Sequence, residues 1–232
     1  MINVLISTYN EVNNICPMLG MVITTLEKLA VPFLIIVVDG NSPDGTSNIV
    51  KKLNHPNIKI VDEKCKSGLG NSYMKGLEFC KYEYTVILDA DLQHDPFSIF
   101  QMFSQATSHN KYDIVTGTRY SKSGMVSRWS FKRKFISAVA NNLAKYVLGL
   151  KSSDLTGSFR CYRTEVLKTI LSKSTCKGFG IQLELIARAE KMKCQIAEVS
   201  IIFYDRVAGD SKFGLKEIYL FLKTVLNLYI TI

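Results

Sequence analysis

The chain has 232 residues, of which 47% are hydrophobic and 21% are charged. This length and apolar content predict one globular domain, residues 1–232, with a core large enough to fold without disulfides or a structural metal. The six cysteines form no CxxC pair and have no histidine at metal-ligand spacing, which argues against a zinc site and a disulfide framework. We expect reduced thiols in a protein that faces the cytosol.

The net charge of +9 is divided unevenly along the chain. Residues 1–118 carry 9 Lys or Arg and 12 Asp or Glu, a balance of −3, whereas residues 119–232 carry 20 and 8, a balance of +12. An acidic first half suits a cation-dependent nucleotide site, and a basic second half suits phosphates or an anionic membrane. Nucleic acid is the competing partner, but no nucleic-acid-binding motif accompanies the charge, so we expect none to bind.

The sequence lacks the usual signals for entering or crossing a membrane. Its first residues have neither the basic start nor the long apolar stretch of a secretory signal. The longest apolar run, residues 218–232, is interrupted by Lys223 and Asn227 and falls short of the roughly 20 residues that span a bilayer. We expect the protein on the cytosolic side, with a tail that is either a buried terminal helix or a helix at a membrane surface.

Runs rich in β-branched residues predict strands at residues 2–7, 33–39, 58–61, 84–89, 113–117 and 196–203. Helix-length segments separate the first five, and this alternation predicts a mostly parallel sheet flanked by helices. Ligands of open α/β sheets bind at the carboxyl edge of the strands. Polar residues follow four of the predicted strands, at residues 8–11, 39–42, 89–91 and 117–120, and these segments form the candidate site.

Asp89 and Asp91 are two carboxylates separated by the small residue Ala90, directly after a predicted buried strand. Residues two apart on an extended backbone point the same way, so both carboxylates can face one cation. Such oxygen ligands, with Gln93 as a further donor, suit a hard divalent ion such as Mg²⁺ or Mn²⁺. An ordinary acidic turn is the alternative, because Asp-x-Asp is common by chance.

Residues 7–11, 39–46, 89–91 and 117–120, in this order and spacing, resemble the family-two glycosyltransferases of GT-A fold. Two later segments, residues 153–160 and 205–212, narrow the resemblance to the catalytic subunits of dolichol-phosphate mannosyltransferases. The resemblance covers nearly the whole chain and implies an α/β, Rossmann-like GT-A fold with a basic, membrane-facing C-terminal part. Residues 1–118 would hold the nucleotide sugar and metal, and residues 119–232 the acceptor.

The resemblance also implies roles for individual residues. The nucleotide sugar would be contacted by Ser7, Tyr9, Glu11, Val37, Asp39, Asp89, Ala90, Asp91, Gln93, Arg119, Arg206 and Lys212. Val37 and Asp39 would meet the guanine. Asp89, Asp91 and Gln93 would hold the metal, while Asp91, Arg119 and Arg206 would act in catalysis. The acceptor phosphate would be held by Arg119, Arg133 and Ser137.

Two positions depart from the pattern of the family. Ser7 stands where the family usually has Pro, and residues 39–42, Asp-Gly-Asn-Ser, replace Asp-Asp-Gly-Ser. Asp39 would therefore contact the guanine base without a second carboxylate beside it. The three histidines, His55, His94 and His109, form no arrangement with Ser or Cys typical of a nucleophilic triad and are expected at the surface or in loops.

The implied reaction is an inverting, metal-dependent transfer of mannose from GDP-mannose to dolichyl phosphate, giving dolichyl β-D-mannosyl phosphate for glycosylation and GPI-anchor synthesis. The enzyme would be peripheral at the cytosolic face of the endoplasmic reticulum membrane, held there by small membrane-embedded tethering subunits. Residues 128–137 mix aromatic and basic residues at helical spacing, which suits a lipid headgroup surface or a solvated helix packed on the sheet. Two other functions stay open: a dolichyl-phosphate glucosyltransferase that uses UDP-glucose, and a non-catalytic nucleotide-binding subunit.

Overall fold

A seven-stranded sheet lies at the centre of the computed structural model, which describes residues 1–121, 125–126, 131–204 and 215–232. The strands are β1 (Ile2–Thr8), β2 (Phe33–Asp39), β3 (Ile58–Asp62), β4 (Tyr84–Asp89), β5 (Ile114–Thr118), β7 (Arg160–Arg163) and β8 (Ile196–Ser200). Their order is β3-β2-β1-β4-β7-β5-β8, with β7 antiparallel to β4 and β5 and the other neighbours parallel. Two short strands, β6 (Met125–Val126) and β9 (Ile202–Phe203), pair separately.

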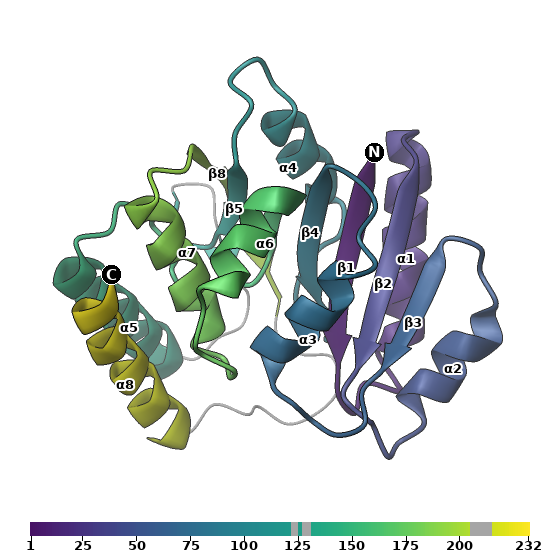
Figure 1. The fold of residues 1–232 in the computed structure, drawn as a ribbon, viewed down its shortest axis with the longest axis horizontal. Helices are drawn as coiled ribbons and strands as arrows, with labels where there is room; N and C mark the ends of the chain where they lie inside the picture. Colours follow the sequence, from purple (N-terminus) through teal and green to yellow (C-terminus); the bar gives the residue numbers. More distant parts are fainter. Residues whose placement is uncertain (122–124, 127–130, 205–214) are drawn as a thin grey trace.

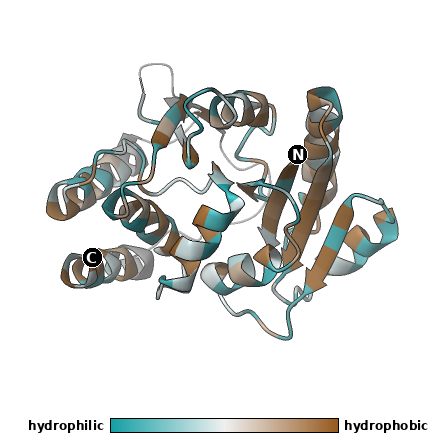
Figure 2. Cartoon of the chain, turned by 45° about the horizontal axis from the view of Figure 1, so that its top comes forward, coloured by the Kyte–Doolittle hydropathy of each residue, from teal (hydrophilic) through white to brown (hydrophobic). Residues whose placement is uncertain are grey.

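Helices cover both faces of this sheet (Figure 1). They are α1 (Ile15–Leu29), α2 (Thr46–Leu53), α3 (Leu69–Leu77), α4 (Ser98–Ala106), α5 (Phe131–Leu148), α6 (Thr164–Ser172), α7 (Ile181–Lys191) and α8 (Leu215–Thr231). One core cluster joins α1 and α4 to the sheet, and a second joins α3, α6 and α7 to the opposite face. Strands covered on both faces are rich in apolar residues, and the hydrophobic colour predominates on the strands beside the N-terminus in Figure 2.

The prediction of a mostly parallel α/β sheet is confirmed, and each predicted strand is present with small shifts at its ends. The last predicted strand is divided at Ile201 into β8 and β9. The sequence does not predict β7, because this short segment begins and ends with arginine. Arg160 is nevertheless fully buried, since its guanidinium donates to Thr116 Oγ1 at 3.1 Å and to the Gln182 carbonyl at 2.7 Å.

A third core cluster lies at the end of the molecule beyond β8, where α5 and α8 pack beside α7 (Figure 1). Leu148 of α5, Leu183 of α7 and Leu228 of α8 are buried in it. The terminal helix is therefore joined to the rest of the fold by one of its faces. Within the described part of the chain, no helix combines the length and the apolar character that crossing a bilayer demands.

Gly76 allows α3 to lie close to the sheet. A Cβ at this position would overlap Leu5 Cδ1 and would lie 3.0 Å from Val38 Cγ2. We expect Gly76→Ala to lower the free energy of unfolding by about 1–3 kcal/mol, because the packed core has no room for the methyl group. Urea denaturation followed by circular dichroism measures this change.

Gly20 in α1 is the matched control, because a Cβ there would meet no atom within 4 Å. We expect Gly20→Ala to raise the free energy of unfolding by about 0.5–1 kcal/mol, since alanine loses less backbone entropy in a helix. Equal effects of the two substitutions would contradict the close approach of α3.

Candidate active site

The carboxyl ends of β2, β1 and β4 lie side by side at one edge of the sheet. Parallel pairing sets Thr8 opposite Asp39 and Ser7 opposite Asp89. Three residues predicted to bind the nucleotide sugar, Asp39, Ser7 and Asp89, therefore lie on three adjacent strands. The segment before β7 reaches the same edge, where the Ser158 hydroxyl donates to Asp89 Oδ2 at 2.5 Å.

Asp39 joins the chain segments that follow β1 and β2. Its side chain is buried, with 1% of the residue exposed, and its carboxylate accepts hydrogen bonds from Thr8 Oγ1 at 2.8 Å and from the Ser42 amide and hydroxyl at 2.8 and 2.7 Å. Val37, two residues earlier, is fully buried in the core. Contact of either residue with a guanine stays a prediction.

The loop after β1 is held by the loop after β2. Three consecutive backbone amides, those of residues 10–12, donate at 2.9–3.0 Å to side chains of the second loop: Ser42, Thr46 and Asp44. This arrangement places Tyr9 and Glu11 at the strand ends. Asn41 adopts a φ of 62° where the family usually has glycine, a conformation that asparagine tolerates.

Lys66 is a further cation at this edge of the sheet. Its ammonium lies 3.8 Å from the centroid of the Tyr9 ring, within the range of a cation–π interaction. The segment that carries it is anchored by Glu63, whose buried carboxylate accepts from the Ser67 hydroxyl at 2.6 Å and pairs with Lys75 at 2.8 Å. Burial alone would raise the pKa of Glu63, but these partners lower it.

Asp89, Asp91 and Gln93 supply the oxygen atoms that a hard divalent cation prefers. Leu92 adopts a φ of 61°, an uncommon conformation for leucine, and this turn lets the Gln93 amide donate to Asp91 Oδ1 at 3.3 Å. Among the described residues, no group of three or more His, Cys, Asp or Glu side chains is arranged so that it could hold a metal ion. The donor set fits Mg²⁺ or Mn²⁺ that takes its remaining ligands from water and a bound diphosphate.

Arg119 forms a buried ion pair with Asp154 at the end of β5. Its Nε and Nη2 donate to the two carboxylate oxygens at 2.7 and 2.8 Å, and Nη2 also donates to Thr156 Oγ1 at 2.8 Å. Burial alone would raise the pKa of Asp154, but the guanidinium holds it below its usual value. The same pair keeps the pKa of Arg119 above its usual range, although burial alone would lower it. The guanidinium of Arg119 therefore stays charged and is held in position by Asp154.

Ser137 lies beside the residue that follows Arg119, because its hydroxyl and the Tyr120 hydroxyl are 2.8 Å apart. The structure thus brings two of the three predicted acceptor residues to the same region. The Arg133 backbone lies in α5, but its side chain is outside the described part of the chain. Arg206 and Lys212 also lie outside the described residues.

His94 is expected at the surface or in a loop; it lies in the segment between β4 and α4, but it is not at the surface. The residue is 2% exposed, and its ring packs 5.1 Å from that of Phe159 and 5.0 Å from that of Phe203. Burial lowers its pKa to about 4, so the imidazole is neutral at physiological pH. The polar neighbours of His94 in the sequence gave no signal of these aromatic partners, which come from β9 and from the segment before β7.

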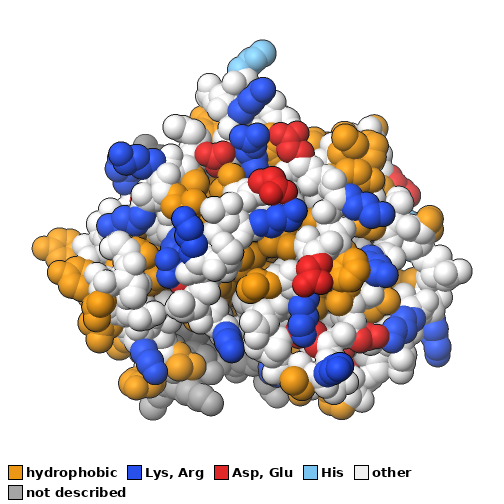
Figure 3. All heavy atoms as spheres, in the orientation of Figure 1, with side chains coloured by type: hydrophobic (Ala, Val, Ile, Leu, Met, Phe, Trp, Pro, Cys, Tyr) orange, Lys and Arg blue, Asp and Glu red, His pale blue; other side chains and the backbone are white. Residues whose placement is uncertain are grey.

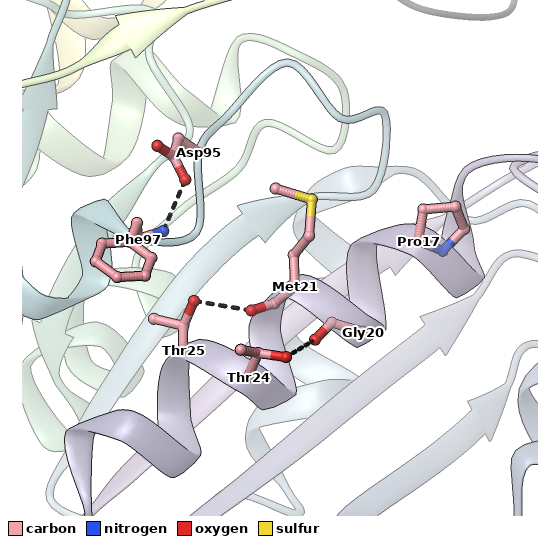
Figure 4. Close-up of a pocket in the computed structure, with 7 residues that line it drawn as sticks. All are labelled: Pro17, Gly20, Met21, Thr24, Thr25, Asp95 and Phe97. Carbon is pink, nitrogen blue, oxygen red and sulfur yellow. Dashed lines mark hydrogen bonds between the residues drawn. The ribbon is translucent and has the colours of Figure 1, made fainter.

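A shallow pocket lies apart from these residues, between α1 and the segment before α4 (Figure 4). It is lined by Pro17, Gly20, Met21, Thr24, Thr25, Asp95 and Phe97. The two threonine hydroxyls donate to carbonyls of their own helix, and Asp95 accepts from the Phe97 amide. None of the predicted site residues lines this pocket, so the strand ends remain the candidate site.

Paired carboxylates after a central strand, at the carboxyl edge of a mostly parallel sheet, fit a transferase of the GT-A class. Residues 3–171 match the sequence profile of glycosyl transferase family 2, and the chain belongs to this family. A polyprenol monophosphomannose synthase of Mycolicibacterium smegmatis is 32% identical over 218 residues, which cover 91% of this chain and 80% of that protein. An undecaprenyl-phosphate mannosyltransferase of Micrococcus luteus is 31% identical over 217 residues, covering 90% of this chain and 86% of that protein.

Solved structures agree on the fold. Glucosyl-3-phosphoglycerate synthase of Mycobacterium tuberculosis, crystallised with Mn²⁺, UDP and glucosyl-3-phosphoglycerate, superposes with a TM-score of 0.71. It is 16% identical, and the match covers 100% of this chain and 79% of that one. The same protein in complex with Mg²⁺ and UDP gives a TM-score of 0.72. At this identity the likeness establishes the GT-A fold alone.

The Arg119–Asp154 pair predicts a large stability effect. Asp154→Asn leaves the buried guanidinium without its counter-charge, so we expect the free energy of unfolding to fall by about 3–5 kcal/mol at neutral pH. Because the pKa of Asp154 is depressed in the folded state, the contribution of this carboxylate is present above its unfolded pKa of about 4 and is lost at lower pH. Urea denaturation at several pH values should show the difference from wild type shrinking below about pH 4.

Asp62→Asn is the matched control, because Asp62 pairs with Lys51 at the surface, where their side chains are 44% and 48% exposed. Its loss should change the free energy of unfolding by less than about 1 kcal/mol. Similar values for the two variants would show that Arg119 does not depend on Asp154.

Proposed function

We propose that this chain transfers mannose from GDP-mannose to dolichyl phosphate, forming dolichyl β-D-mannosyl phosphate for glycosylation and GPI-anchor synthesis. The observation that carries the proposal is the pair Asp89 and Asp91 at the sheet edge of a family-2 glycosyltransferase. Relatives named for mannosyl transfer to polyprenol and undecaprenyl phosphate support a mannosyl donor and a polyprenyl phosphate acceptor. The choice of GDP as the nucleotide and of dolichol as the lipid rests on the resemblance of residues 153–160 and 205–212 to dolichol-phosphate mannosyltransferases.

The proposed reaction is one displacement. An oxygen of the acceptor phosphate attacks the anomeric carbon of mannose, and the bond from that carbon to the diphosphate breaks with its electron pair leaving on GDP. Attack from the opposite side converts an α-linked donor into a β-linked product. A phosphate monoester has a second pKa of about 6, so the attacking oxygen is already charged near neutral pH and needs no strong base. Arg119, Arg133 and Ser137 would orient it.

Mg²⁺ or Mn²⁺ held by Asp89, Asp91 and Gln93 would neutralise the charge that builds on the diphosphate. The structural neighbour crystallised with Mn²⁺ and UDP supports a metal of this kind. We assign Asp91, Arg119 and Arg206 to catalysis, with Lys212 as a further partner of the phosphates. In this proposal, residues 1–118 hold the donor and residues 119–232 the acceptor.

The proposed place of action is the cytosolic face of the endoplasmic reticulum membrane, where the enzyme is peripheral. The charge of +12 in residues 119–232 supports contact with an anionic surface. Small membrane-embedded subunits would tether the chain there. This part of the proposal is tested by localisation in cells and by purification with associated membrane proteins.

We expect Asp91→Ala to lower the rate of mannosyl transfer by at least about a hundredfold, because the leaving diphosphate loses its principal counter-charge. Initial rates with GDP-mannose and a short-chain dolichyl phosphate, at saturating Mg²⁺, measure the loss. Asp62→Ala is the control, since Asp62 lies at the end of β3 at the same edge but is exposed to solvent. A folded, fully active Asp91→Ala enzyme would overturn the metal assignment.

The choice of donor is tested with wild-type protein given GDP-mannose or UDP-glucose, each with and without Mg²⁺ or Mn²⁺. We expect metal-dependent product from GDP-mannose alone. Product from UDP-glucose instead would make the chain a dolichyl-phosphate glucosyltransferase. If folded protein gives no product with either donor, yet binds nucleotide by calorimetry, the chain is a non-catalytic nucleotide-binding subunit.

A further inference from the structure

Helices α5 and α8 present large apolar side chains to solvent at one end of the molecule. They are Leu143 and Tyr146 on α5 and Tyr219, Leu226, Tyr229 and Ile230 on α8, with exposed fractions from 43% to 89%. We call these six residues the α5–α8 apolar face. In Figure 3, hydrophobic side chains gather along the left edge of the molecule, where Figure 1 shows the two helices.

The six side chains of this face are not among the buried residues of the third core cluster. The two helices already bury Ala144, Leu148, Val225 and Leu228, each at most 5% exposed, in the third core cluster. Nine of the 18 large hydrophobic side chains exposed in the described residues nevertheless lie on α5 or α8. Apolar residues concentrated on one surface, rather than scattered singly, mark a site of interaction.

The charges on the same helices favour an anionic lipid surface as the partner. The sequence of α5 contains four Lys or Arg and no Asp or Glu, and that of α8 contains two Lys and one Glu. Basic residues near an anionic leaflet each contribute about 1 kcal/mol to binding. Three of the six apolar residues are tyrosines, whose amphipathic rings suit the boundary between headgroups and acyl chains.

Helix α5 also connects this face to the proposed acceptor site. Ser137, near the start of the helix, lies 2.8 Å from the Tyr120 hydroxyl next to Arg119, and the same helix continues to Leu143 and Tyr146. A polyprenyl phosphate keeps its chain in the bilayer while its phosphate enters the enzyme. If α5 lies in the headgroup layer, the acceptor phosphate can reach Ser137 while the lipid chain stays in the bilayer.

We propose that the α5–α8 apolar face inserts into the headgroup layer of a bilayer that contains anionic lipids, and that this contact sets the acceptor edge of the enzyme against the membrane. The inference rests on the proposed function for the acceptor, but the lipid contact is a separate property of the two helices. Insertion of this kind reaches about 5–10 Å into the bilayer.

The test compares wild type with Leu226→Asp/Ile230→Asp. Both side chains are more than half exposed, so the fold should tolerate the change. Co-sedimentation is measured with vesicles of phosphatidylcholine alone and with 30% phosphatidylserine, in the absence of donor. We expect wild type to prefer the anionic vesicles and the variant to bind them at least about tenfold more weakly.

The matched control is Leu53→Asp/Met74→Asp, which alters two exposed apolar residues on α2 and α3. It should bind vesicles as wild type does. Transfer is then measured to a long polyprenyl phosphate in vesicles and to a ten-carbon prenyl phosphate in solution. The Leu226→Asp/Ile230→Asp variant should lose the first activity about tenfold and keep the second within about twofold, in line with the loss of lipid binding.

Unchanged vesicle binding by this variant would overturn the proposal, as would wild type that does not bind anionic vesicles. A wild-type dimer that the variant converts to a monomer, with equal vesicle binding, would make the face a protein interface and also overturn it. Failure of the proposed function gives a different result: wild type would transfer no mannose to either acceptor, although lipid binding still depends on Leu226 and Ile230.

Discussion

Parallel pairing of β2, β1 and β4 is the constraint on which the candidate site depends. Parallel strands bring their carboxyl ends to one edge, and the register fixes which residues meet there, with Ser7 beside Asp89 and Thr8 beside Asp39. A slip of one residue would turn each strand-end side chain to the other face of the sheet. The apolar residues on both faces of these strands oppose such a slip, because each belongs to one of two separate cores. The core thus sets the geometry of the polar edge.

The second half of the chain completes this edge through β7 and the residues before it. Asp154 pairs with Arg119, and Ser158 binds Asp89. Since β7 lies between β4 and β5, the segment that contains Asp154 and Ser158 bridges the carboxylates of the first half and the cation of the second. A buried pair of this kind requires its partner, because an unpaired buried charge is costly. Hydrogen bonds and an ion pair therefore connect the proposed donor and acceptor regions.

Local sequence patterns predict the features that depend on neighbouring residues in the chain. The strands follow from β-branched runs, and Asp89 and Asp91 follow from their spacing at a strand end. The Arg119–Asp154 pair joins residues far apart in the sequence, and no periodicity marks it. The sequence does not predict β7, because its buried Arg160 is stabilised by hydrogen bonds to Thr116 and Gln182 and not by apolar character. His94 is likewise buried by aromatic rings from distant segments.

The reaction we propose brings together two anions, a nucleotide diphosphate and a lipid phosphate, at an edge that itself carries carboxylates. Arg119 alone cannot balance this charge, because Asp154 neutralises it and the pair presents a dipole rather than a net positive charge. In the proposal, the balance comes from a cation on Asp89 and Asp91, with Arg206 and Lys212, for the donor and from other basic residues for the acceptor. Helix α5 is suited to the second task, since its sequence has four Lys or Arg and no acidic residue. The same helix carries part of the apolar face, so attraction of the acceptor phosphate and contact with its membrane would depend on one element.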